Sequence, residues 1–281
     1  ISYAAQLLKE NADVDFVDLN LGCPIDLIFK QGGGSALLRR ENVLEQIITT
    51  CSRVLGDKPF TVKTRMGIYM NKPVAKDLLP KFEKWGASAV TLHGRSREQR
   101  YTKSANWQYI NESGALLKEI PLIGNGDILS YEDYVNVKKS YTHVSSVMLG
   151  RGPLLKPWIF KEIKEGKAYD ISSQERFEVL QKFVTYGLEH WGSDNQGVET
   201  TRKFLLEWLS FLHRYVPYGI LQHPPQKINQ RPETTPYLCR DEMETLLSSS
   251  KSSDWIKISE MLLGKVPDHF DFLPKHRANA Y

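Results

Sequence analysis

One unit recurs through the first half of the chain: a helical pattern, a short apolar strand, and a loop of polar residues and glycines. Strand patterns lie at residues 14–19, 60–63, 89–92, 122–124 and 146–149, and helical patterns lie between them at 42–55, 74–85, 107–120 and 131–140. Strands that alternate with helices in this way form βα units and a parallel sheet. The pattern therefore predicts an α/β fold for this half of the chain.

Each of these strands ends in residues that suit a ligand. The strand ends are Asn20-Leu21-Gly22-Cys23, Lys63-Thr64-Arg65, His93-Gly94-Arg95, Asn125-Gly126-Asp127 and Gly150-Arg151-Gly152. In a (β/α)8 barrel, or TIM barrel, all the loops after the strands open on one face, whereas a doubly wound sheet gathers its ligand groups at one switch point. Polar residues after five successive strands favour the TIM barrel, of which five of the eight strands are visible.

After Pro157 the strand patterns stop and amphipathic helices follow. The capping-box sequence Ser172-Ser173-Gln174-Glu175 precedes apolar residues at helical spacing up to Trp191. Further helical runs lie at 204–215, 240–247 and 255–263. We expect an incomplete barrel over residues 1–167 and an all-helical domain with its tail over residues 168–281.

The composition sets outer limits on the function. The chain has 281 residues, of which 41% are hydrophobic, and a formal net charge of +4, so it can bury a large core. No stretch approaches the roughly 20 apolar residues that a membrane span needs. The three cysteines are odd in number and widely spaced, which predicts neither a disulfide framework nor a metal site and indicates a reducing compartment.

Cys23 differs from the other two cysteines in its surroundings. It follows an apolar strand and precedes Pro24, which ends the strand, and Gly32-Gly33-Gly34, which lets backbone approach a ligand. The alternative for a free cysteine is a small buried hydrophobe, and Cys51 fits that description because it lies at helical spacing with apolar residues. The polar and glycine neighbours of Cys23 favour a functional thiol.

The cationic and glycine-rich strand ends predict an anionic, aromatic ligand. Lys63 and Arg65 point to the same side of their strand, and His93 ends the next one. The turn at Asn125-Gly126-Asp127 and the segment Gly150-Arg151-Gly152 offer backbone N–H groups to a phosphate. No G-x-G-x-x-G motif follows a strand, so a Rossmann dinucleotide site is not expected. Together these features suggest flavin mononucleotide (FMN).

A basic cluster that contains one aromatic residue follows the third strand. Its members are Arg95, Arg97, Arg100 and Lys103, with Tyr101 among them. Cations beside an aromatic ring suit contacts with RNA phosphates and stacking on a base. A solvated surface would account for the net charge of +4, so the local cluster is what suggests RNA binding.

In their order along the chain, these motifs resemble the tRNA-dihydrouridine synthases. The resemblance rests on Asn20-Leu21-Gly22-Cys23-Pro24, Gly32-Gly33-Gly34, Ala36-Leu37-Leu38, Val62-Lys63-Thr64-Arg65, His93-Gly94-Arg95, Asn125-Gly126-Asp127 and Gly150-Arg151. It extends over the whole chain. Segments 92–101, 187–193 and 272–276 are similar to the eukaryotic members that act on a variable-loop uridine, at position 47.

The resemblance implies FMN-dependent reduction of the C5–C6 bond of a uridine in tRNA, with NADPH as the reductant and mRNA as a second possible substrate. Cys23 would protonate C5 as the general acid, because a thiol is acidic enough to release a proton near neutral pH. The expected FMN-binding residues are Lys63, His93, Asn125, Gly126, Asp127, Gly150 and Arg151, and the expected substrate-binding residues are Asn20, Arg65, Arg95, Arg97 and Arg100. We also expect a monomer in the cytoplasm, the nucleus or both.

The same resemblance places three further barrel strands, with a flavin-binding glutamine on the third, and a zinc-finger region before Ile1. We therefore expect this chain alone to bind FMN weakly and to have little or no activity. Three alternatives stay open. The chain could be an FMN-barrel oxidoreductase of the dihydroorotate dehydrogenase type, an RNA-binding protein without catalysis, or a phosphate-binding barrel without flavin.

Overall fold

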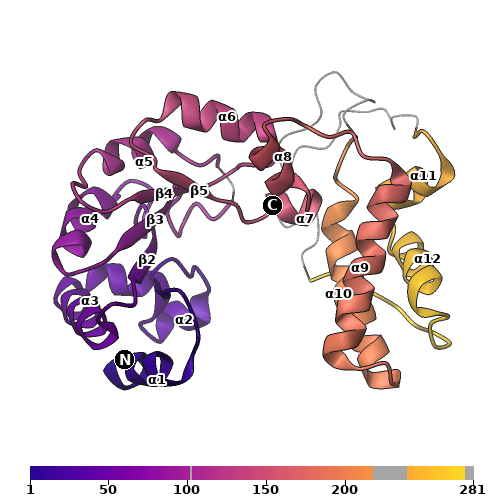
Figure 1. Ribbon diagram of the computed structural model, residues 1–281, viewed down its shortest axis with the longest axis horizontal. Helices are drawn as coiled ribbons and strands as arrows, with labels where there is room; N and C mark the ends of the chain where they lie inside the picture. The colour runs from indigo at the N-terminus through magenta and orange to yellow at the C-terminus, as the bar shows by residue number, and fades with distance from the viewer. Residues whose placement is uncertain (102, 218–238, 276–281) are drawn as a thin grey trace. The chain divides into compact units, whose positions relative to one another are not determined.

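The computed structural model describes residues 1–101, 103–217 and 239–275, which divide into two compact units (Figure 1). Unit 1 comprises residues 1–128 and 132–150, and unit 2 comprises residues 129–131 together with the described residues from 151 onward. Each unit has a hydrophobic core of its own.

Unit 1 is a parallel sheet with helices between its strands. The described strands are β1 (Val17–Asn20), β2 (Phe60–Arg65), β3 (Ala89–His93), β4 (Leu122–Asn125) and β5 (Ser146–Met148), which lie side by side in that order. The helices are α1 (Ser2–Asn11), α2 (Asp26–Lys30), α3 (Glu41–Leu55), α4 (Ala75–Lys84), α5 (Trp107–Gly114) and α6 (Tyr131–Ser140), with a 3-10 helix η1 (Gly34–Arg39). Five consecutive parallel strands confirm the predicted α/β fold and are consistent with part of a TIM barrel.

One face of the sheet is apolar and covered by helices. Val62, Val90 and Leu122 are buried and belong to one core with Ile48 of α3 and Phe82 of α4. Figure 1 shows α3, α4 and α5 along this side of the strands. Because side chains alternate along a strand, the intervening residues lie on the opposite face, where the polar strand ends gather.

Unit 2 contains only helices in its described part. These are α7 (Gly152–Leu155), α8 (Ile159–Glu165), α9 (Ser173–Trp191), α10 (Asn195–Leu212), α11 (Glu242–Ser248) and α12 (Ser252–Leu263). The predicted capping box is confirmed, since Ser172 Oγ accepts the N–H of Glu175 at 3.2 Å and the Glu175 carboxylate accepts the N–H of Ser172 at 2.7 Å. Across the described ranges, no helix is both long enough and apolar enough to cross a membrane.

Two helices differ in length from their predictions. The helix expected at 107–120 ends at Gly114, because the Glu83 carboxylate accepts the N–H groups of residues 118, 119 and 120 in place of helical carbonyls. Conversely, α10 begins nine residues before the predicted run at 204–215. Its first turn is polar, and Asp194 caps it by accepting the N–H of Gly197 at 2.8 Å.

The short helix α7 belongs to unit 2 and contacts the longer helix α10. The indole Nε1 of Trp208 on α10 donates to the carbonyl of Leu154 at 2.9 Å. The compact units accordingly divide after Gly150. The domain boundary expected at 167/168 stays a prediction, and residues 218–238 and 276–281 of the expected helical domain lie outside the described residues.

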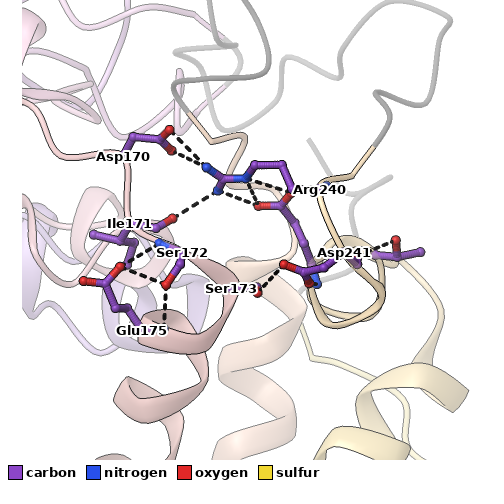
Figure 2. Close-up of polar contacts among 9 residues, drawn as sticks. Asp170, Ile171, Ser172, Ser173, Glu175, Arg240 and Asp241 are labelled. Atoms are coloured by element: carbon purple, nitrogen blue, oxygen red, sulfur yellow. Dashed lines mark hydrogen bonds and ion pairs between the residues drawn. The ribbon is translucent and has the colours of Figure 1, made fainter.

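Arg240 joins the segment before α9 to the start of α11 (Figure 2). Its guanidinium donates to both carboxylate oxygens of Asp170 at 3.0 Å, to the Ile171 carbonyl at 3.1 Å and to the Glu244 carboxylate at 2.7 Å. Glu244 is fully buried. Burial alone would raise the pKa of Glu244, but the hydrogen bonds and charge of Arg240 outweigh burial and lower it. Glu244 is therefore a buried carboxylate that depends on Arg240.

We expect Arg240→Met to lower the free energy of unfolding by about 3 kcal/mol at neutral pH, because it leaves Glu244 buried without its cation. A carboxyl group with a lowered pKa stabilises the fold above its ordinary pKa and loses that contribution as the pH falls through the folded-state pKa. The difference between the two proteins should therefore narrow below about pH 4. Urea unfolding followed by circular dichroism measures both effects.

Lys257→Met is the matched control for this substitution. Lys257 pairs with Asp254 at 2.9 Å, but its side chain is 64% exposed. Removal of a surface ion pair should change the free energy of unfolding by less than about 1 kcal/mol. Equal losses in the two variants would contradict the role assigned to Arg240.

Candidate active site

The carboxyl ends of the strands meet at one edge of the sheet. Asn20 lies in register with Lys63, Arg65 with His93, and His93 with Asn125. These side chains share the face opposite the helical core, because they alternate with the buried apolar residues. The register thus brings predicted site residues from four strands together.

Cys23 lies in the loop after β1, which is held from two sides. Its carbonyl accepts a hydrogen bond from Ser35 Oγ at 2.8 Å and from the Ser35 N–H at 3.3 Å. Gly34 has a φ of +54°, and a Cβ there would lie 2.7 Å from Cys23 Cβ. Asn20 Oδ1 accepts the N–H of Gly22 at 2.9 Å. The sequence suggested that the glycines admit a ligand, but Gly34 makes room for Cys23.

Arg65 holds the same loop from within the sheet. The side chain is buried; its Nε donates to the Gly22 carbonyl at 2.7 Å, and its Nη1 donates to the Ser96 carbonyl at 3.2 Å. Arg65 therefore ties the loop of Cys23 to the loop after β3. This geometry gives Arg65 a positioning contact, and its expected contact with substrate stays a prediction.

The side-chain ammonium of Lys63 has neither a hydrogen bond nor an ion pair with any described residue. Burial lowers the pKa of the Lys63 ammonium, and repulsion from Arg65 lowers it further, while Asp18 opposes both. Asp18 itself accepts a hydrogen bond from Thr61 Oγ1 at 2.7 Å. A partly buried ammonium without a bonding partner favours an electron-rich or anionic ligand beside it.

Arg95 is the centre of a buried polar network. Its Nη2 donates to the two oxygens of Asp127 at 2.7 and 2.6 Å, its Nε donates to the Lys103 carbonyl at 2.6 Å, and its Nη1 lies 3.3 Å from His93 Nε2. Asp127 also accepts the N–H of Ala105 at 2.7 Å. Arg95 is 3% and His93 is 6% exposed. The roles expected for Arg95 at the substrate and for Asp127 at FMN stay predictions, and the structure pairs the two side chains with each other.

The residues expected at the cofactor phosphate have different surroundings. Asn125 Nδ2 donates to the Met148 carbonyl at 2.7 Å and so links β4 to β5. Gly126 has a φ of +156°, and a Cβ there would lie 2.3 Å from the side chain of Ala105. At Gly150 a Cβ would meet no atom within 4 Å, so there is open space for a ligand. Arg151 begins the second part of unit 2, and its cofactor role stays a prediction.

Arg97 belongs to a cationic and aromatic surface that we call the Phe29 surface; it comprises Asp26, Phe29, Arg39, Tyr69, Arg97 and Arg100. The guanidinium carbons of Arg97 and Arg39 lie 3.9 and 4.7 Å from the centroid of the Phe29 ring. Arg39 also donates to the Tyr69 hydroxyl at 3.3 Å. Such a combination of guanidinium groups and rings is typical of RNA-binding surfaces.

A cavity of about 250 Å³ opens on the Phe29 surface, lined by Ile68, Tyr69, Arg97, Glu98 and Arg100. Arg97 forms an ion pair with Asp26, and Arg100 lies 3.6 Å from the same carboxylate. Arg100 is 57% exposed, and Arg97 is 19% exposed. A phosphate bound here would have to compete with Asp26 for both cations.

The three cysteines are free thiols in different environments. Cys51 is buried in the core of unit 1, as predicted, and Cys23 and Cys239 are half-buried. Burial raises the pKa of the Cys51 thiol. Among the residues that the structure describes, no group of three or more His, Cys, Asp and Glu side chains could hold a metal ion.

Ser35 is a residue near the site that sequence reasoning missed, whereas Gly34 and Tyr101 were expected to contact a ligand directly. Ser35 and Gly34 shape the loop of Cys23, and the Tyr101 ring lies 6.3 Å from the His93 ring. The glycine run was a signal for Gly34, but no local pattern marks Ser35 as the partner of Cys23.

Comparisons with known proteins give a consistent result. The family model described as "Dihydrouridine synthase (Dus)" matches residues 1–214. Proteins of Xenopus laevis and Homo sapiens named tRNA-dihydrouridine(47) synthase-like are each 58% identical over 277 residues, which is 99% of this chain and 42% of the relative. A tRNA-dihydrouridine(47) synthase of Cryptococcus neoformans is 50% identical over 287 residues, covering 99% of this chain and 39% of its own length.

The chain therefore spans about two fifths of the length of the curated relatives that it matches. The names of these relatives give tRNA, the position number 47 and the coenzyme NAD(P)(+).

We expect Gly34→Ala to displace the loop of Cys23. Alanine at a φ of +54° is strained, and its Cβ would overlap Cys23, so the free energy of unfolding should fall by about 2 kcal/mol. The displaced thiol should also become more accessible. The rate of alkylation of Cys23 relative to Cys239, measured by mass spectrometry, should therefore increase.

Gly33→Ala is the matched control, because Gly33 has a φ of −95° and its nearest neighbour is a methyl group of Ile28 at 3.3 Å. It should leave the alkylation ratio unchanged. If Gly34→Ala retained both the stability and the alkylation ratio of the unsubstituted chain, the packing of Gly34 against Cys23 would not determine the loop.

Proposed function

The chain belongs to the dihydrouridine synthase family, and we propose that it reduces the C5–C6 double bond of a uridine in tRNA to 5,6-dihydrouridine with FMN and NADPH. The names of the relatives support tRNA as the substrate, position 47 as the target and NAD(P) as the coenzyme. The observation that carries the proposal is Lys63, a partly buried ammonium without a bonding partner among the described residues. It lies at the sheet edge that also holds the Cys23 loop and His93.

The residues at this edge fit FMN. Lys63 offers a cation to an electron-rich ring system, and His93 lies on the neighbouring strand. The open space at Gly150 and the N–H groups of the turn at Gly126 suit a phosphate or its ribityl chain. Asn125, Asp127 and Arg151 complete the proposed FMN set. When bound and reduced, FMN would supply the hydride that reaches C6 of uracil, and NADPH would renew it.

Cys23 would supply the proton that completes the reduction. Its thiol would donate a proton to C5 and become a thiolate, which regains a proton from water. Arg65 and Ser35 hold the loop that carries this thiol. Asn20 would orient the edge of the base, since it lies at the end of the strand before that loop.

The tRNA substrate requires a binding surface because the target uridine must leave its stack, at a cost of a few kcal/mol. We assign this role to the Phe29 surface and to the helices of unit 2. The guanidinium groups of Arg97 and Arg100 would contact phosphates, and the rings would stack on bases. A monomer in the cytoplasm or nucleus, with mRNA as a second substrate, is part of the same proposal.

The test of the reaction uses a chimera in which this chain replaces the matching residues of the Xenopus laevis relative. With FMN, NADPH and unmodified tRNA, we expect dihydrouridine at position 47, detected by mass spectrometry. Cys23→Ala should lower the rate by about 100-fold or more, because the general acid is lost. Binding of tRNA by the same variant should stay unchanged.

Cys239→Ala is the control, since Cys239 belongs to unit 2 and has no proposed role in the reaction, and it should retain the rate. Equal rates for Cys23→Ala and the unsubstituted chimera would assign the proton to another group. A chimera that binds FMN and tRNA but forms no dihydrouridine would overturn the proposal in favour of RNA binding without catalysis.

For the RNA surface, we expect the double variant Arg97→Gln/Arg100→Gln to weaken tRNA binding about tenfold at physiological salt. Two fewer phosphate contacts should also reduce the slope of log Kd against log salt by about 1.5. The control is Arg53→Gln/Lys84→Gln, which removes two exposed cations from α3 and α4. If Arg97→Gln/Arg100→Gln left the salt dependence of Kd unchanged, the Phe29 surface would not be part of the tRNA interface.

A further inference from the structure

We propose that Arg95 is a positioning residue that keeps the His93 imidazole neutral, with its proton on Nδ1. Asp127 and the Lys103 carbonyl would fix Arg95 for this task. The part of His93 in catalysis rests on the proposed function, but the state of its ring follows from the contacts of Arg95.

The first step concerns donors and acceptors. Arg95 Nη1 lies 3.3 Å from His93 Nε2. A guanidinium group has only N–H donors and no acceptor. Nε2 must therefore accept in this contact, and a neutral imidazole that accepts on Nε2 carries its proton on Nδ1.

The second step concerns the rigidity of Arg95. Nη2 donates to both carboxylate oxygens of Asp127, and Nε donates to the Lys103 carbonyl, so each of the three guanidinium nitrogens has its own partner. The side chains of Arg95 and Asp127 are 3% and 22% exposed. Because water has little access to this pair, the guanidinium keeps one orientation toward His93.

The backbone also fixes the distance between the two residues. The N–H of Arg95 donates to the His93 carbonyl at 2.7 Å, and the N–H of Gly94 donates to the Asn125 carbonyl at 3.0 Å. A Cβ at Gly94 would lie 2.9 Å from the backbone nitrogen of Asn106. The tight turn therefore needs glycine between His93 and Arg95.

The third step concerns the charges that face His93. Arg65 lies in register with it on β2, Lys63 lies two residues earlier on that strand, and Arg95 contacts its ring. Asp127, a carboxylate of this network, is paired with Arg95. The Tyr101 ring lies 6.3 Å from the His93 ring. Protonation of His93 would place another positive charge among these cations and break the bond from Arg95, so the neutral ring is favoured.

A neutral His93 has a defined consequence for the reaction. With its proton on Nδ1 the neutral ring can donate a hydrogen bond from that nitrogen, and it is not a proton source near neutral pH. The neutral ring thus leaves the role of general acid to Cys23. The Arg95–Asp127 pair thus acts on the reaction indirectly, by keeping the His93 ring neutral.

The test is a side-chain nitrogen NMR spectrum of the full chain labelled with ¹⁵N-histidine, with the His93 signals assigned by His93→Gln. We expect an unprotonated Nε2 and a protonated Nδ1, and a ring that stays neutral below the ordinary histidine pKa of about 6.5. In Arg95→Met the proton should move largely to Nε2, the position preferred by unconstrained imidazole. The titration midpoint of His93 should rise by about one pH unit.

Two further variants separate position from charge. Arg95→Lys keeps a cation but lacks the planar fork, so it should lose the Nδ1 preference while its midpoint stays low. Arg97→Met, in the same loop, removes an arginine that contacts Asp26 and Phe29 and should leave the His93 signals unchanged. If Arg95→Met does not fold, as judged by circular dichroism, Asp127→Asn replaces it and should give a mixture of the two ring forms.

A proton on Nε2 in the unsubstituted chain would overturn the proposal. The proposal would also fail if the His93 signals of Arg95→Met were identical to those of the unsubstituted chain. Where Arg95→Met does not fold, the same comparison is made with Asp127→Asn. These results do not depend on the reaction. A chimera that forms no dihydrouridine would contradict the proposed function and leave the ring assignment standing.

Discussion

The parallel hydrogen-bond ladder between β1 and β4 is the constraint on which the site depends. It aligns Asn20 with Lys63, Arg65 with His93, and His93 with Asn125, although these residues are spread over more than a hundred positions of the chain. A parallel ladder can align such distant residues because each crossover helix returns the chain to the same end of the sheet. A shift of one residue in any pair would turn the polar side chains into the helical core.

Three arginines that look alike in the sequence have different tasks in the structure. Arg65 is buried and binds the carbonyl before Cys23, while Arg95 is buried and binds Asp127. Arg97 lies across the Phe29 ring at the surface. The first two hold loops in place, and the third is available to a phosphate that displaces Asp26. Burial thus separates the two arginines that hold loops from the one that we propose for tRNA binding.

The sequence could predict the strands and their polar ends, because an apolar run followed by glycine or a charged residue is a local signal. The end of α5 was not predictable, since it depends on Glu83, which lies 35 residues before the N–H of Lys118 that it accepts. The pairing of Arg95 with Asp127 spans 32 residues and has no local pattern. The glycine run marked Gly34 as a position where backbone could approach a ligand. Its contact with Cys23, eleven residues earlier, depends on the tertiary structure and has no local pattern.

The excess of cations at the sheet edge favours a neutral His93, which leaves one candidate for the general acid, Cys23. Lys63, Arg65 and Arg95 bring three cations close to His93, while Asp127 is engaged with Arg95 and Asp18 with Thr61. A surplus of positive charge suits an anionic cofactor and opposes a charged imidazole. Arg65 also lies close enough to the Cys23 side chain to interact with it. The cations that would hold FMN therefore lie on the same side of the sheet as the thiol that we propose as the general acid.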